Sequence, residues 1–93
     1  MDKEKTATNI AGLTYIRPPV AGEEITVTAP NGPNMIGVYV RAGGDLIAYH
    51  QREERGDIDS DNRKRKSAER LGVAAVKHWR EAGFAVTDHV LWT

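Results

Sequence analysis

Basic side chains are concentrated in one short stretch of this 93-residue chain, and they are the residues best suited to bind a ligand. Between positions 63 and 80 there is one acid, Glu69, and there are seven bases: Arg63, Lys64, Arg65, Lys66, Arg70, Lys77 and Arg80. Lysine and arginine bind phosphate and carboxylate groups through charge-assisted hydrogen bonds. We therefore predict an anion site at residues 63–66, where helix N–H groups could also contribute, and a basic stripe beyond it. The alternative is a solvated helix face neutralised by neighbouring acids.

Acidic side chains are concentrated immediately before that stretch. Residues 53–61 contain one base, Arg55, and five acids: Glu53, Glu54, Asp57, Asp59 and Asp61. We predict that they form a secondary acidic surface. The alternating acids at 57–61 resemble the start of a calcium loop, but Ala68 occupies the position of the bidentate carboxylate and Asn62 that of the usual glycine. A capping and turn segment is therefore favoured over a metal site.

The remaining polar residues form no recognisable catalytic set. The three histidines, His50, His78 and His89, do not have a metal-ligand spacing such as i and i+4. The chain has no cysteine, which excludes disulfides and thiolate metal sites. It also has no glycine-rich phosphate loop and no dinucleotide-binding fingerprint. We predict a protein that is not an enzyme and that has no metal or cofactor.

One arrangement of residues nevertheless suggests a nuclease. Gly37-Val38-Tyr39 on a strand, Tyr49 on the next strand, and then Arg55 and a helix resemble the layout of GIY-YIG nucleases. The second motif of that family reads Tyr-Ile-Gly or close to it, whereas this chain has Ala48-Tyr49-His50. The resemblance implies a metal-dependent nuclease in which Glu69 would bind the metal. We keep it as a third alternative and assign the chain to no family.

A long helix is needed to position the basic residues, and residues 60–82 have its periodicity. At about 100° per residue, one face carries the residues predicted to be buried: Ala68, Leu71, Gly72, Ala75, His78, Trp79 and Ala82. The opposite face carries Lys66, Arg70, Val73, Lys77 and Arg80. Gly83 is the expected left-handed C-cap residue. Asp59, Ser60 or Asp61 could be the N-cap, and a shorter helix could begin at Ser67.

Strands are predicted on both sides of this helix. Period-2 alternation and turn residues indicate strands at 13–17, 24–28, 36–41, 46–51 and 84–92. Gly43 and Gly44 favour a tight hairpin between the third and fourth of these strands. The predicted fold class is α+β: an antiparallel sheet of four to five strands with one long helix packed on one face, in the order β-β-β-β-α-β.

Composition predicts a small soluble domain. Hydrophobic residues make up 40% of the chain and charged residues 28%, while the formal net charge is zero. Any electrostatic function must therefore come from segregated patches. We expect a flexible N-terminal tail at 1–9, a single α+β domain at 10–93, no membrane span and a cytoplasmic location.

These features lead to three functional hypotheses. The first is a non-enzymatic binding protein that uses the basic helix at 63–80 to contact nucleic acid or a nucleic-acid-binding assembly. The second is a small inhibitor or adaptor, of phage or mobile-element type, that binds a host protein complex. The third is the metal-dependent nuclease. The tyrosines, Tyr15, Tyr39 and Tyr49, are expected to pack across strands rather than stack on bases. A homodimer could form through an edge strand.

Overall fold

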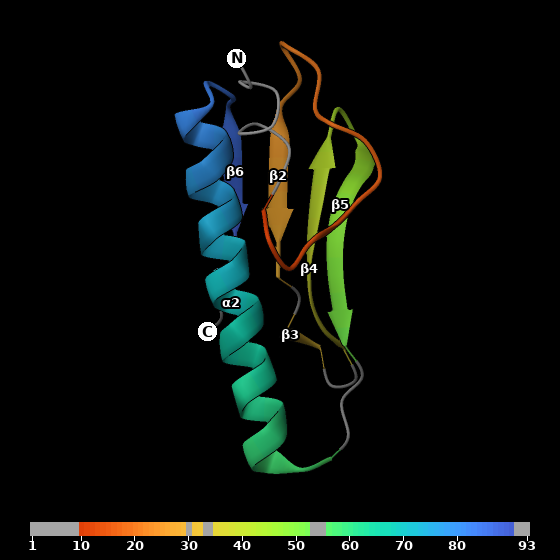
Figure 1. Ribbon diagram of the computed structural model, residues 1–93, viewed down its shortest axis with the longest axis vertical. Helices are drawn as coiled ribbons and strands as arrows, with labels where there is room; N and C mark the ends of the chain where they lie inside the picture. The colour runs from red at the N-terminus through yellow and green to blue at the C-terminus, as the bar shows by residue number, and fades with distance from the viewer. Residues whose placement is uncertain (1–9, 30, 33–34, 53–55, 91–93) are drawn as a thin grey trace.

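A computed structural model describes residues 10–29, 31–32, 35–52 and 56–90 of the chain (Figure 1). In these residues the elements are β1 (Thr14–Tyr15), β2 (Ile25–Thr28), β3 (Asn31–Gly32), β4 (Met35–Ala42), β5 (Asp45–Arg52), α2 (Ile58–Glu81) and β6 (Val86–His89). The segments at 1–9 and 91–93, which include the predicted tail and Trp92, lie outside the described residues. In the described part of the chain, no helix is both long and apolar enough to cross a membrane.

The strands form one sheet, and the helix packs on one face of it. The strand order is β1-β5-β4-β2-β6, with the short β3 paired to β4. Helix α2 packs against β4, β2 and β6 (Figure 1). The α+β class and the order of the main elements are therefore confirmed. The two edges of the sheet are formed by β1 and β6.

One strand pair departs from the prediction. All other pairs are antiparallel, but β6 runs parallel to β2, with Ile25 opposite Val86 and Thr28 opposite His89. The direction follows from the crossover made by α2. Since β5 and β2 are both antiparallel to β4, they run in the same direction. The helix returns the chain to the end of the sheet where β5 began, and β6 then runs in that direction too.

The β4–β5 hairpin matches the prediction closely. Gly43 and Gly44 form its turn with φ angles of 59° and 93°, which glycine adopts without steric cost. The register shifts between Val40, opposite Ala48, and Arg41, opposite Leu46. Ile47 is therefore the extra residue of a bulge.

The helix begins earlier than predicted. Its N-cap is Asp57, whose Oδ1 accepts the backbone N–H groups of Asp59 and Ser60 at 3.1 and 3.4 Å. The proposed N-caps at positions 59–61 and the shorter helix from Ser67 are therefore wrong. Asp57 accepts hydrogen bonds from N–H groups that have no partner within the helix. The helix can therefore begin at Ile58, two residues before the predicted start at residue 60.

The C-terminus of the helix is as predicted. Gly83 has a φ of 100°, its N–H donates to the carbonyl of Arg80, and the N–H of Phe84 donates to that of Trp79. This pair of bonds is the Schellman motif, which directs the chain from α2 into β6.

The core lies between α2 and the inner face of the sheet. The helix buries Ala68, Gly72, Ala75, Val76 and Trp79, and the strands bury Ile25, Val27, Ile36, Val38, Val40 and Ile47 among others. Trp79 is fully buried and makes an edge-to-face contact with Tyr15, their ring centroids being 6.5 Å apart. The predicted helix face is confirmed apart from two residues, since Val76 is also buried and Ala82 is exposed.

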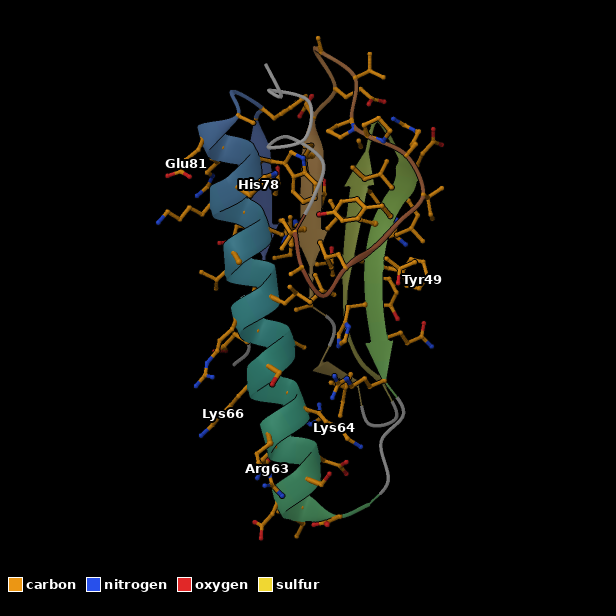
Figure 2. All side chains as sticks on the ribbon, in the orientation of Figure 1. Tyr49, Arg63, Lys64, Lys66, His78 and Glu81 are labelled. Atoms are coloured by element: carbon orange, nitrogen blue, oxygen red, sulfur yellow. The ribbon has the colours of Figure 1, made fainter. Side chains whose placement is uncertain are left out.

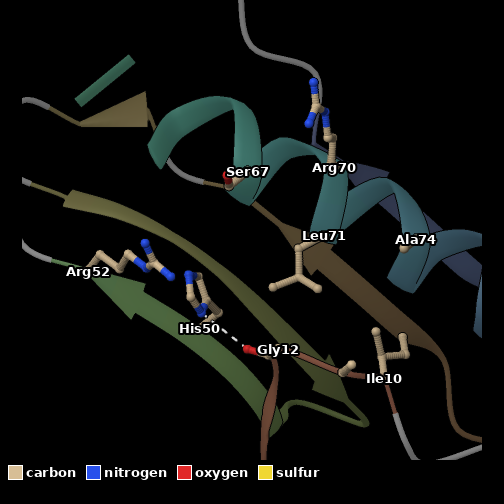
Figure 3. A pocket seen from close by; sticks show the side chains of 9 residues that line it. Ile10, Gly12, His50, Arg52, Ser67, Arg70, Leu71 and Ala74 are labelled. Atoms are coloured by element: carbon tan, nitrogen blue, oxygen red, sulfur yellow. Dashed lines mark hydrogen bonds between the residues drawn. The ribbon is translucent and has the colours of Figure 1, made fainter. Parts of the chain in front are cut away.

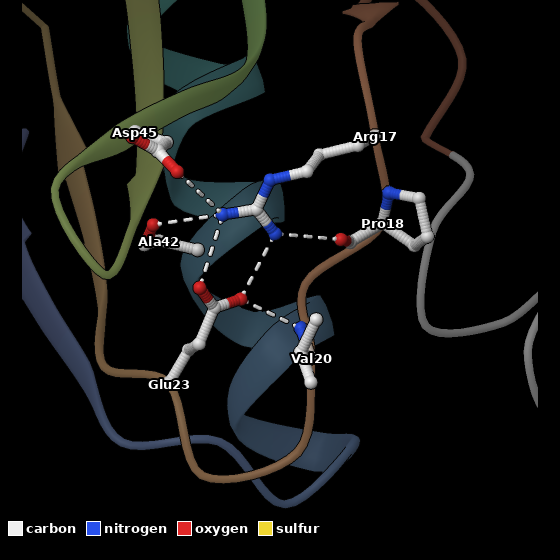
Figure 4. Close-up of polar contacts among 6 residues, drawn as sticks. All are labelled: Arg17, Pro18, Val20, Glu23, Ala42 and Asp45. Atoms are coloured by element: carbon white, nitrogen blue, oxygen red, sulfur yellow. Dashed lines mark hydrogen bonds and ion pairs between the residues drawn. The ribbon is translucent and has the colours of Figure 1, made fainter.

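A network centred on Arg17 attaches the segment between β1 and β2 to the hairpin (Figure 4). Its guanidinium donates to both carboxylate oxygens of Glu23 at 3.0 Å, and to the Ala42 carbonyl and Asp45 Oδ2 at 3.2 Å. The hydrogen bonds from Arg17 lower the pKa of Glu23 below its ordinary value. Glu23 and Asp45 therefore form ion pairs with Arg17 and not with the cations of the helix.

Candidate functional site

The four consecutive cations at 63–66 do not form one site. Because successive residues of a helix are rotated by about 100°, four in a row are distributed around its circumference. Arg63 and Lys66 are exposed, whereas Lys64 and Arg65 are half-buried. Figure 2 shows Lys64 and Lys66 projecting from opposite sides of α2. Lys64 instead lies beside Asp61, with its Nζ 3.9 Å from Oδ1.

The N–H groups at the helix start are not available to an outside anion either. Asp57 accepts those of Asp59 and Ser60 through its side chain, and that of Asp61 through its carbonyl. Residues 63–66 follow the first turn, so their own N–H groups bond within the helix. The predicted convergence of four cations with free N–H groups is therefore wrong.

A different set of basic residues shares one face of the helix. At alternating intervals of three and four residues, α2 presents Arg63, Lys66, Arg70, Val73, Lys77 and Arg80, and all six are exposed. We call these six residues the helix stripe. This spacing places them within about 100° of the helix circumference. The helix stripe is about 25 Å long, since each residue advances about 1.5 Å.

The cations of the helix stripe form no ion pair with the described residues, although Asp59 and Glu81 lie on the same face of α2, four residues from Arg63 and Lys77. In the described part of the chain, ion pairs are formed by Arg17 and Lys64 and by none of the five stripe cations. Arg63 Nε donates to the Asp59 carbonyl at 3.4 Å, and Arg80 Nη2 to the Val86 carbonyl at 3.1 Å. Both bonds are to neutral carbonyls and leave the positive charge in place.

The acids before the helix are mainly structural. Asp57 is the N-cap, and Asp61 is only 6% exposed, with its Oδ2 accepting the N–H of Gly56 at 3.0 Å. Asp61 therefore does not belong to an acidic surface, which corrects the prediction. The physical reason is that Asp61 lies two helical turns before Ala68 and therefore shares the buried face of α2. Asp59 is exposed, and Glu53 and Glu54 lie outside the described residues.

The capping and turn interpretation of this segment is confirmed by the same hydrogen bonds. Among the described residues there is no group of three or more His, Asp or Glu side chains that could hold a metal ion.

A shallow pocket of about 460 Å³ lies beside the helix stripe, and no pattern in the sequence predicted it (Figure 3). Its lining residues come from three segments: Ile10, Ala11 and Gly12; His50 and Arg52 of β5; and Ser67, Arg70, Leu71 and Ala74 of α2. His50 Nδ1 lies 3.2 Å from the Gly12 carbonyl. The pocket exists because the segment before β1 crosses between β5 and the helix, a tertiary relationship that no local pattern encodes.

The remaining candidate residues have mainly packing roles. Tyr39 and Tyr49 are cross-strand partners on the sheet face away from α2, and the Tyr39 hydroxyl donates to Gln51 Oε1 at 3.1 Å. His78 is half-buried and makes an edge-to-face contact with Trp79, while His89 is exposed. Tyr39 and Tyr49 therefore face each other across strands as predicted, whereas Tyr15 packs against Trp79 of the helix.

The residues that resemble a nuclease are not brought together. Tyr39 and Tyr49 lie on the face of the sheet that the helix leaves open. Glu69 is exposed on α2, which packs on the other face. Arg55 lies outside the described residues. No protein-family model, curated protein or solved structure matches this chain.

Proposed function

We propose that this protein is a non-enzymatic binding module that contacts the phosphate backbone of nucleic acid through the helix stripe. The observation that carries the proposal is the alignment of five exposed cations along one face of α2, none in an ion pair with the described residues. Phosphate contacts of this kind give affinity without sequence preference.

The geometry suits a linear polyanion. The helix stripe is straight, and its cations recur about every 5 Å, or every 10 Å across Val73, along the helix axis. A single small anion would engage one or two of them, whereas a polynucleotide presents a phosphate at every step of each strand. The zero net charge of the chain means that this local field, and not the whole molecule, would attract the ligand. We expect the protein to act in the cytoplasm.

A titration with labelled oligonucleotides tests the proposal. Fluorescence anisotropy at several salt concentrations should show binding that weakens as salt increases, because bound phosphates release counterions. Replacing Lys77 by Gln should reduce the slope of log K against log salt by about 0.9 for a duplex or 0.7 for a single strand, if Lys77 makes one phosphate contact.

Arg41→Gln provides the matched control. Arg41 is also exposed, and its replacement also removes one positive charge, but it lies on β4 facing away from α2. It should leave the slope unchanged. An equal effect of the two variants would show that only net charge matters, and the absence of binding at low salt would exclude nucleic acid as the ligand. Affinity capture from a host extract would then test the alternative protein partner.

A further inference from the structure

Arg70 belongs both to the helix stripe and to the rim of the pocket (Figure 3). In the close-up, Leu71 points from the helix toward the sheet, while His50 and Arg52 project from β5. A strand that follows the helix stripe would therefore pass the mouth of this pocket. The pocket has a volume of about 460 Å³ and is shallow and open to solvent, so a ligand bound there would remain partly exposed.

The lining of the pocket favours a ligand with an apolar body and a negative charge. Ile10, Leu71 and Ala74 supply apolar surface. The ionisable lining residues are His50, Arg52 and Arg70, and none of the nine lining residues carries a carboxylate. A nucleotide has this combination of properties, since its base has two apolar faces and its phosphate is an anion.

His50 is held in place for such a contact. A carbonyl oxygen only accepts hydrogen bonds, so the contact with Gly12 requires the proton on Nδ1 of the imidazole. This bond fixes the plane of the ring and leaves Nε2 as the other polar atom of the side chain. Unstacked bases pack on imidazole rings and on the planes of guanidinium groups, and this pocket provides both kinds of group.

We propose that the pocket accepts one unstacked nucleotide of a single strand, with the base against His50 and Leu71 and a phosphate beside Arg52, while the Arg70 side chain points away from the pocket along the helix stripe (Figure 3). This inference rests on the proposed function and specifies its ligand as single-stranded nucleic acid. A base in a duplex is paired and stacked, so a duplex could engage the helix stripe but could not fill the pocket.

Two pocket variants test the proposal with single- and double-stranded oligonucleotides of equal length. His50→Ala should weaken single-strand binding at least about fivefold, the lower end for loss of one base-stacking contact. Arg52→Gln should also weaken single-strand binding, whereas neither variant should change duplex binding. Arg41→Gln, an exposed arginine on the adjacent strand, is the matched control for Arg52→Gln. Thermal unfolding of each variant verifies that it is folded.

A second measurement uses a small probe. In NMR titrations, a 5′-mononucleotide should shift the His50 ring resonances at a lower concentration than inorganic phosphate or the matching nucleoside does. The reason is that the pocket is proposed to bind both the base and the phosphate. Equal responses to phosphate and mononucleotide would overturn the assignment of a base site.

The outcomes separate the two proposals. Oligonucleotide binding that depends on Lys77 but not on His50 or Arg52 would overturn the pocket proposal and leave the helix stripe function intact. Equal losses for single and double strands in the pocket variants would also overturn it. If no oligonucleotide binds to the unaltered protein, both proposals fail.

Discussion

Gly72 of α2 and Val90, the residue after β6, lie so close together that no methyl group fits between them. A Cβ placed on Gly72 would lie 2.9 Å from Val90 Cγ2 and 3.0 Å from Cγ1. Val90 is only 1% exposed, so its side chain has little room to move. The contact holds the middle of the helix against the end of the last described strand, and it keeps the opposite face, which carries the helix stripe, toward solvent.

Gly72→Ala should therefore destabilise the protein although alanine is the better helix former. Alanine gains about 1 kcal/mol in helix propensity, while overpacking a tight core costs about 1–3 kcal/mol. We expect a net loss of about 1 kcal/mol in the free energy of unfolding, measured by urea denaturation. In a Val90→Ala background, the same substitution should be neutral or stabilising. Additive effects of the two changes would contradict the contact.

Asp61 and Asp59 should differ in their contribution to stability although both are acids near the helix start. Asp61→Ala removes the hydrogen bond that a buried carboxylate accepts from the Gly56 N–H, and a hydrogen bond to a charged group typically contributes about 1.5–3 kcal/mol. Asp59 is exposed, and its replacement by Ala should cost only the helix-dipole contribution of about 0.3–1 kcal/mol. Denaturation curves of the two variants give the comparison, and an equal loss would show that Asp61 acts only through its charge.

Replacing Lys64 should mainly reduce stability, whereas replacing Lys66 should mainly reduce ligand binding. Lys64 retains 17% side-chain exposure beside Asp61, so Lys64→Ala should reduce the free energy of unfolding by about 0.5–1 kcal/mol. Lys66 is exposed, and Lys66→Ala should change stability by less than about 0.5 kcal/mol. Oligonucleotide affinity at low salt should show the reverse order, with Lys66→Ala the weaker binder. If Lys64→Ala weakens binding more than Lys66→Ala, the assignment of the helix stripe is wrong.

The Arg17–Glu23 pair should make stability dependent on acid pH. Hydrogen bonds from Arg17 and from the Val20 N–H lower the pKa of Glu23 in the folded state. Such a carboxylate contributes stability that is complete above the unfolded-state pKa of about 4.3 and is lost as pH falls through the lower folded-state pKa. Glu23→Gln should therefore be less stable than the unaltered protein at pH 7, and the difference should shrink at pH 3. Its exposed neighbour provides the control, since Glu24→Gln also removes one carboxylate but no contact with Arg17, and an equal effect of the two variants at both pH values would contradict the role of the Arg17–Glu23 pair.

The sequence by itself determined the elements whose residues interact locally. The 3.6-residue periodicity identified the helix and its buried face, Gly83 identified its end, and Gly43-Gly44 identified the hairpin. Each of these signals depends on the backbone preference of one residue or on side-chain spacing within one element. Four of the five exposed cations of the helix stripe could be predicted in the same way, because α2 presents Lys66, Arg70, Lys77 and Arg80 opposite its apolar face.

Only the tertiary structure decided how these elements meet. The direction of β6 depends on where α2 returns the chain to the sheet. The pocket is the clearest case, since Gly12, His50 and Leu71 are far apart in the sequence and adjacent only when β5 and the helix flank the first described segment. Contacts between distant segments arise from packing and loop closure, and neither of these produces a periodic pattern in the sequence.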